Sequence, residues 1–122
     1  MSTIELTTID PTPVITFTFH GELNKAVALR LIQKWTQYLS ERPVEKHILV
    51  WDAREMTGYE PAARTFWQKA LKENSPQTEI IYLISDKRII RLGATLMSAF
   101  SKLTIKAVAT PEEVELPVAM YA

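Results

Sequence analysis

Charged side chains follow two apolar runs of the sequence, and their types suit them to ion binding or acid–base chemistry. Asp52 and Arg54 follow the first run, and Asp86 and Arg88 follow the second. If the two runs form neighbouring parallel strands, about 5 Å apart, the four charges share one edge of the sheet. Two arginines there would hold a carboxylate or phosphate through paired N–H donors. In the alternative, structural interpretation, Asp86 caps a helix and Asp52 pairs with an arginine.

A second candidate lies between the first of these runs and the proline that opens the next predicted helix. Thr57 and Gly58 have the types of turn residues, and a turn at a helix N-terminus exposes backbone N–H groups that favour negative charge. Together with Arg54 and Arg88 they form a candidate anion or phosphate site. In the alternative interpretation, Thr57 and Gly58 only shape the turn.

The sequence gives little support for thiol, phosphate-loop or metal chemistry. The chain has no cysteine, no glycine-rich phosphate loop, and two histidines, His20 and His47, whose spacing forms no ligand cluster. We therefore predict no catalytic residue, no metal site and no cofactor. A weaker alternative is an enzyme that uses Asp52, Arg54 and Asp86 at the strand ends, which would require carboxylates with raised pKa values in a pocket.

Length and charge limit the class of protein. The 122 residues fit a single domain, residues 1–122, and 47% are hydrophobic. Fourteen basic and fourteen acidic residues balance, which argues against a nucleic-acid partner. No signal sequence and no apolar run of about 20 residues is present, so we expect a cytoplasmic protein that is not an integral membrane protein.

Hydrophobic periodicity predicts alternating strands and helices. Alternation predicts a strand over 14–20, with Ile4 and Leu6 in a short companion strand, and Asn24 is a suitable N-cap for an amphipathic helix to about Glu41. The remaining elements are strands at 48–51, 80–84 and 103–108, helices from Pro61 and over 87–102, and a short helix start at 110–113.

This order, β(β)αβαβαβ with a short C-terminal helix or tail, predicts an α/β domain with a mostly parallel five-stranded sheet. Right-handed crossovers that step in one direction place all helices on one face. The other face then needs a cover, either the apolar tail Val114–Ala122 or a second subunit.

The third predicted helix has more apolar surface than one sheet contact requires. Its apolar residues span roughly 220° at 100° per residue. Either neighbouring helices cover the surplus, or one flank faces a partner subunit or an apolar ligand. The candidate flanks contain Ile90, Ala94 and Met97 on one side and Leu92 and Ala99 on the other. Lys87, Arg88 and Arg91 crowd the first turn, where they would attract an acidic partner or lipid headgroup or remain solvated charges.

The chain resembles the STAS/SEC14-like superfamily, which includes bacterial anti-sigma factor antagonists and lipid-transfer domains. The resemblance rests on the segment Asp52–Tyr59, on the Ala63-Arg64-x-x-Trp67 pattern and on Arg91–Ala94. It implies a STAS-like binding module rather than a catalyst. In the antagonists, a kinase partner phosphorylates a serine after the equivalent strand, whereas here Thr57 is the only hydroxyl nearby.

We therefore predict a non-enzymatic, cytosolic bacterial module of the STAS type that contacts a partner protein or a second copy of itself. The alternative is a carrier of a lipid or small apolar ligand. The predicted interaction surface consists of Arg54, Tyr59, Glu60, Ile90, Leu92, Ala94, Met97 and Ala99.

Overall fold

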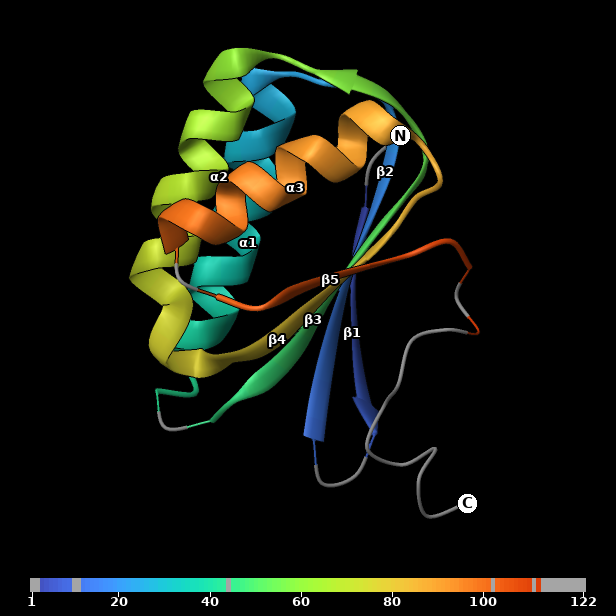
Figure 1. The fold of residues 1–122 in the computed structure, drawn as a ribbon. Coiled ribbons are helices and arrows are strands. Elements are labelled where there is room, and N and C mark those ends of the chain that lie inside the picture. The colour runs from blue at the N-terminus through green and yellow to red at the C-terminus, as the bar shows by residue number, and fades with distance from the viewer. Residues whose placement is uncertain (1–2, 10–11, 44, 102, 111, 113–122) are drawn as a thin grey trace.

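The computed structural model of this protein describes residues 3–9, 12–43, 45–101, 103–110 and 112. Five strands form one sheet in the order β1-β2-β3-β4-β5, and three helices lie on one side of it (Figure 1). The elements are β1 (Thr3–Ile9), β2 (Thr12–Leu23), α1 (Lys25–Ser40), β3 (His47–Tyr59), α2 (Pro61–Asn74), a 3-10 turn η1 (Ser75–Gln77), β4 (Thr78–Ile84), α3 (Arg88–Ser101) and β5 (Ile105–Val108).

The predicted α/β class and mostly parallel sheet are confirmed. Strands β2 to β5 pair in parallel, and β1 pairs antiparallel with β2 at one edge. Each crossover helix returns the chain to the next position in the sheet, and all three helices occupy the same face, as right-handed crossovers in one direction require. No described helix is both long and apolar enough to cross a membrane.

The predicted helix starts hold for the first two helices and fail for the third. Asn24 caps α1, its Oδ1 accepting a hydrogen bond of 2.9 Å from the Val27 N–H, and Pro61 opens α2 where its missing N–H costs nothing. Asp86 does not cap α3. That helix begins at Arg88, and the side chain that accepts from the backbone before it is Ser85, whose Oγ lies 3.1 Å from the Lys87 nitrogen.

Side chains on the helix face of the sheet form the main core. Tryptophans of α1 and α2 meet two phenylalanines of β2 in edge-to-face contacts, with ring centroids 5.0 Å apart for Phe17 and Trp67. Trp51 of β3 packs edge-to-face on Trp67, with centroids 5.5 Å apart. Such contacts add to the free energy gained by burying the rings. Alternate residues of the same strands form a smaller buried cluster on the opposite face, made of Val14, Ile48, Val50, Tyr82 and Ile84.

That opposite face is the one the sequence predicts to need a cover. The predicted cover, Val114–Ala122, and half of the short helix start at 110–113 lie outside the described residues.

The largest difference from prediction is the length of β3. The segment 52–59 continues the strand to Tyr59, where a turn at Thr57 and Gly58 was expected. It pairs with the end of β2 through two register shifts, and Gly21 adopts φ +71° between them. A positive φ is accessible to glycine at little cost, so Gly21 permits the bulged pairing that keeps β3 extended.

Candidate functional site

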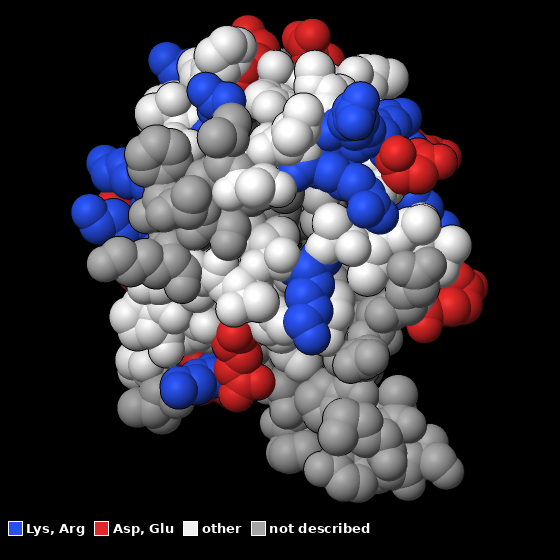
Figure 2. Space-filling model, in the orientation of Figure 1, with Lys and Arg blue, Asp and Glu red and all other residues white. Residues whose placement is uncertain are grey.

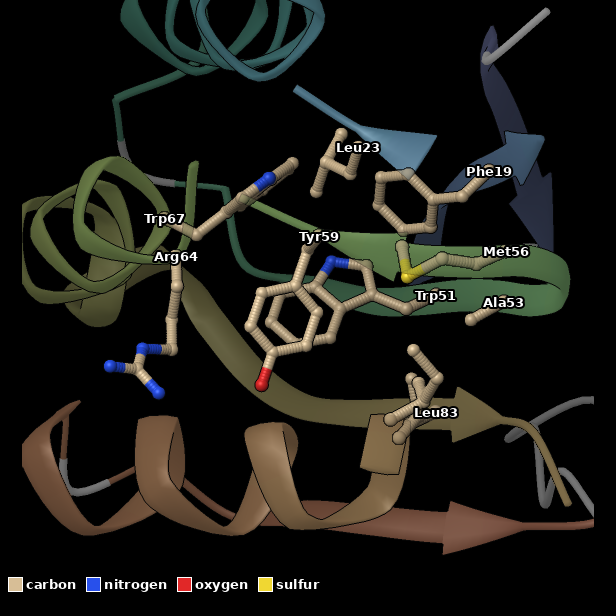
Figure 3. A pocket seen from close by; sticks show the side chains of 10 residues that line it. Phe19, Leu23, Trp51, Ala53, Met56, Tyr59, Arg64, Trp67 and Leu83 are labelled. Atoms are coloured by element: carbon tan, nitrogen blue, oxygen red, sulfur yellow. The ribbon is translucent and has the colours of Figure 1, made fainter. Parts of the chain in front are cut away.

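The carboxyl ends of β2, β3 and β4 border two hollows, one on each face of the sheet. Ligands of open α/β sheets gather at this end of the strands. The hollow on the helix face, here called the apolar cavity, lies among the strand ends, α2 and α3 (Figure 3). The hollow on the opposite face, the polar cleft, is lined by Thr18, Phe19, His20, Asp52, Arg54 and Glu55. Phe19 borders both.

The apolar cavity is walled by carbon-rich side chains. Its lining consists of Phe19, Leu23, Trp51, Ala53, Met56, Tyr59, Arg64, Trp67, Leu83 and Ile90. The space measures about 430 Å³ including the part open to solvent, and about 40 Å³ of it admits the centre of a water molecule. A few waters fit as the walls stand, and a larger guest has to displace a wall side chain.

Eight of the ten lining residues are buried, each 5% exposed or less. Tyr59, at the end of β3, and Arg64, in the first turns of α2, are the two that reach solvent. These two residues therefore form the mouth of the cavity. Figure 3 shows the polar ends of both side chains directed toward α3, away from Leu23 and Phe19.

Tyr59 is seated against α3 at a glycine. A Cβ placed on Gly93 would lie 2.6 Å from the Tyr59 hydroxyl oxygen, closer than real Cβ contacts. Gly93 thus provides the space that the tyrosine ring occupies beside the helix backbone. Ile90, one turn earlier, extends the same face of α3 into the cavity wall.

Three N–H donors around this cavity have no partner in the part of the chain that the structure describes. They are Trp51 Nε1, Trp67 Nε1 and Arg64 Nε, and all three are buried. Buried donors are usually paired, and an unpaired one costs about 1–3 kcal/mol. The wall therefore combines apolar surface with unused hydrogen-bonding capacity.

The start of α3 is tied to the strands beside the cavity by two cations. The Lys87 Nζ donates to the carbonyl oxygens of Met56 at 2.5 Å and Arg54 at 3.4 Å, and the Arg91 Nε donates to the Ser85 carbonyl at 2.7 Å. These bonds explain two of the cations in the first turn of α3, where cations oppose the helix dipole. They fix the helix that carries Ile90 and Gly93.

The polar cleft contains one ion pair and one contact between a histidine and a carboxylate. Arg54 donates to both carboxylate oxygens of Asp52 at 2.7 and 2.9 Å, and His20 Nδ1 lies 2.6 Å from the Glu55 carboxylate. The arginine hydrogen bonds lower the pKa of Asp52 below its ordinary value. Asp52 pairs with an arginine as the structural interpretation predicted, and it lacks the raised pKa that the enzyme hypothesis required.

The candidate anion site is not assembled as predicted. Thr57 is exposed within β3, Gly58 pairs with Glu22 in the sheet, and Arg54 is engaged by Asp52. The cap position of α2 is Glu60, an acid, whose carboxylate accepts a bond of 2.8 Å from the Lys25 N–H. The turn that was to present free N–H groups is replaced by strand pairing. No cluster of three potential metal ligands occurs among the described residues.

The structure places the residues of the predicted interaction surface in different environments. Ile90 is wrong as a surface residue, because it is 4% exposed in the cavity wall, whereas Leu92 is 58% exposed and Ile89, which was not selected, is 63% exposed. Tyr59 lies at the cavity mouth. The side chains of Ala94, Met97 and Ala99 lie outside the described residues.

Figure 2 shows Lys and Arg side chains gathered near the start of α3, beside uncharged surface.

Comparison with known proteins reveals the class of fold. No family model and no curated protein matches the chain. An uncharacterised DUF3478-family protein of Shewanella loihica PV-4 with a SpoIIAA-like fold superposes with a TM-score of 0.75 at 12% identity, over 92% of this chain and 89% of that one.

Two structures of the anti-sigma factor antagonist SpoIIAA show the same fold. The unphosphorylated form has a TM-score of 0.63 at 11% identity, covering 91% of this chain and 92% of that one. The phosphorylated form, described as a Bacillus cell fate determinant, has a TM-score of 0.63 at 12% identity over 98% and 100% of the two chains. The predicted STAS-type fold is confirmed: this protein has a SpoIIAA-like fold.

Proposed function

We propose that this protein is a non-enzymatic binding module of the STAS type that holds a small, mainly apolar ligand in the apolar cavity. The observation that carries the proposal is a cavity at the carboxyl ends of parallel strands with almost entirely apolar walls and unpartnered N–H donors behind them. The enclosed space of about 40 Å³ is smaller than the roughly 300–1,000 Å³ typical of ligand sites, so a guest enters only when wall side chains move aside. This size favours a short chain or single ring over a complete membrane lipid.

Binding of octan-1-ol tests this proposal, with tryptophan fluorescence and thermal unfolding as readouts. Two of the three tryptophans, Trp51 and Trp67, belong to the cavity wall, so a bound guest alters their emission. A ligand that binds only the folded state adds about 2.7 kcal/mol to the free energy of unfolding at a hundred times its Kd.

A matched pair of variants locates the site. Ala53→Val places two methyl groups in the cavity wall, and Ala70→Val makes the same change at a buried position of α2 outside the cavity. Overpacking destabilises both proteins, by roughly 1–3 kcal/mol. Only Ala53→Val should weaken octan-1-ol binding. Equal affinity of the two variants, or no binding by the wild-type protein, would refute the proposal.

A second candidate function, contact with a protein partner or a second copy of this chain, is favoured by the exposed pair Ile89 and Leu92 on α3. Large apolar side chains on a surface rich in cations are typical of contact sites. We propose cytoplasmic action for this contact, in keeping with the sequence, and a homodimer as its simplest form.

Light scattering of wild-type protein and Leu92→Glu tests the contact. Thr95→Glu adds the same charge to an exposed position one turn along α3 and serves as the control. The contact hypothesis requires a larger mass for wild type and Thr95→Glu than for Leu92→Glu. A monomer in all three, together with equal binding in a pull-down, contradicts it.

A further inference from the structure

The cavity mouth contains a cation that no acid among the described residues balances. Arg64 is the one charged residue among the ten that line the cavity. Arg54 pairs with Asp52 and Arg42 with Glu41, whereas Arg64 forms no ion pair with any described acid. Its Nε is buried and has no hydrogen-bond partner among the described residues.

The acid nearest to Arg64 along α2 is engaged elsewhere. Glu60 lies one turn before Arg64, and its carboxylate accepts from the Lys25 N–H at 2.8 Å. This bond joins the start of α2 to the start of α1. Arg64 lines the cavity with its carbon chain, and Figure 3 shows its guanidinium directed out of the cavity toward α3. The charged end therefore lies on the solvent side of the mouth, where it forms no ion pair with Glu60.

On this basis we infer that the ligand of the apolar cavity is a short organic acid anion, with its apolar part inside and its carboxylate at the mouth against Arg64. The inference rests on the proposed ligand-binding function and adds the chemical class and direction of the ligand. A planar guanidinium binds a carboxylate through two parallel N–H donors, and a charge-assisted bond is stronger than a neutral one.

The apolar wall and the charged mouth of the cavity recognise different parts of the ligand. Leu83, Ile90 and Met56 offer only apolar contact and cannot distinguish an acid from its neutral analogue. Arg64 alone among the lining residues discriminates by charge. The Tyr59 hydroxyl, held beside Gly93, provides a second polar atom at the mouth.

Octanoate and octanamide form a matched pair of probes, because they differ chiefly in charge at one end. At neutral pH and low salt we expect the wild-type protein to bind octanoate roughly three- to tenfold more tightly than octanamide, a modest factor because the mouth is open to solvent. Arg64→Gln should bind the two equally, and Arg64→Lys should keep part of the preference. Lys69→Gln removes an exposed cation from the same helix and should keep all of it.

The outcomes separate this inference from the proposed function. Binding of octanamide and octan-1-ol without a preference for octanoate overturns the inference and leaves the apolar site standing. A preference that survives Arg64→Gln unchanged also overturns it. Failure of all three probes to bind overturns the proposed function itself.

Discussion

His47 offers the sharpest test of the structure, because it is a titratable side chain sealed in the core. It is 1% exposed at the start of β3, and its Nε2 accepts a hydrogen bond of 3.2 Å from the Trp35 Nε1. Burial disfavours the charged imidazolium and lowers the pKa of His47 from 6.5 to about 4, an effect that a backbone contact with Gln77 offsets only in part. The native state therefore holds this imidazole neutral.

The lowered pKa makes the free energy of unfolding depend on pH. Between pH 6.5 and about 4 the unfolded chain binds a proton at His47 that the native protein does not, so stability falls as pH falls. At about 1.4 kcal/mol per pH unit, this interval corresponds to a loss of about 3 kcal/mol. The stabilising contribution is complete above pH 6.5 and is lost by about pH 4.

Urea unfolding from pH 8 to pH 4 measures this dependence. We compare wild type with His47→Gln, which keeps an oxygen able to accept from Trp35 but cannot titrate, and with His20→Gln, which changes the other histidine on the opposite face of the sheet. Wild type and His20→Gln should lose stability steeply over this range, and His47→Gln should lose about 3 kcal/mol less. A pH dependence that is the same in all three proteins refutes the buried, neutral histidine.

Three further predictions concern glycines and the polar cleft. Gly21→Ala should cost about 1–2 kcal/mol in urea unfolding, because φ is +71° there, whereas Gly58→Ala, which also meets open space, should cost less than half as much. Gly93→Ala should destabilise the wild-type protein by about 1 kcal/mol through its clash with Tyr59, yet stabilise Tyr59→Ala by about the same amount through helix propensity; equal effects in both backgrounds would contradict that contact. Asp52→Asn should cost about 1 kcal/mol at pH 7 and nothing well below pH 3, since the lowered pKa of this carboxyl contributes stability above its ordinary value of 3.8 that is lost on acidification; a loss that persists unchanged at pH 2.5 would argue against the ion pair.

Elements specified by local sequence were predicted accurately. Asn24 caps α1 and Pro61 opens α2 because both effects involve neighbouring residues only. The apolar runs at 48–51 and 80–84 lie in central strands with side chains buried on both faces. Periodicity and capping chemistry are sufficient for such elements.

Features that depend on distant segments were not predicted. Thr57 and Gly58 predict a turn in what is the outer half of β3. Pairing with the bulged end of β2 beyond Gly21 keeps this segment extended instead. On α3, the periodicity identified an apolar helix but not which of the adjacent residues Ile89 and Ile90 faces solvent, since that choice depends on how the helix is rotated against the sheet.

The apolar cavity had almost no local signal. Trp67 is buried on α2, but an unfilled space beside it depends on how closely α2 and α3 approach the strand ends. Arg64 lies three residues before the buried Trp67 on the same helix. This spacing was the one available hint that the arginine borders the core.

The sheet order β1-β2-β3-β4-β5 has a consequence for how the chain acquires its structure. Every strand pairs with its neighbour in sequence, so no strand has to wait for a later one to be inserted beside it. The β1–β2 hairpin can form as soon as residue 23 is available, and each later helix and strand adds to an existing edge. Because loop-closure entropy grows with separation along the chain, this order favours fast folding in the direction of synthesis. The cavity is completed only when α3, its last wall, docks.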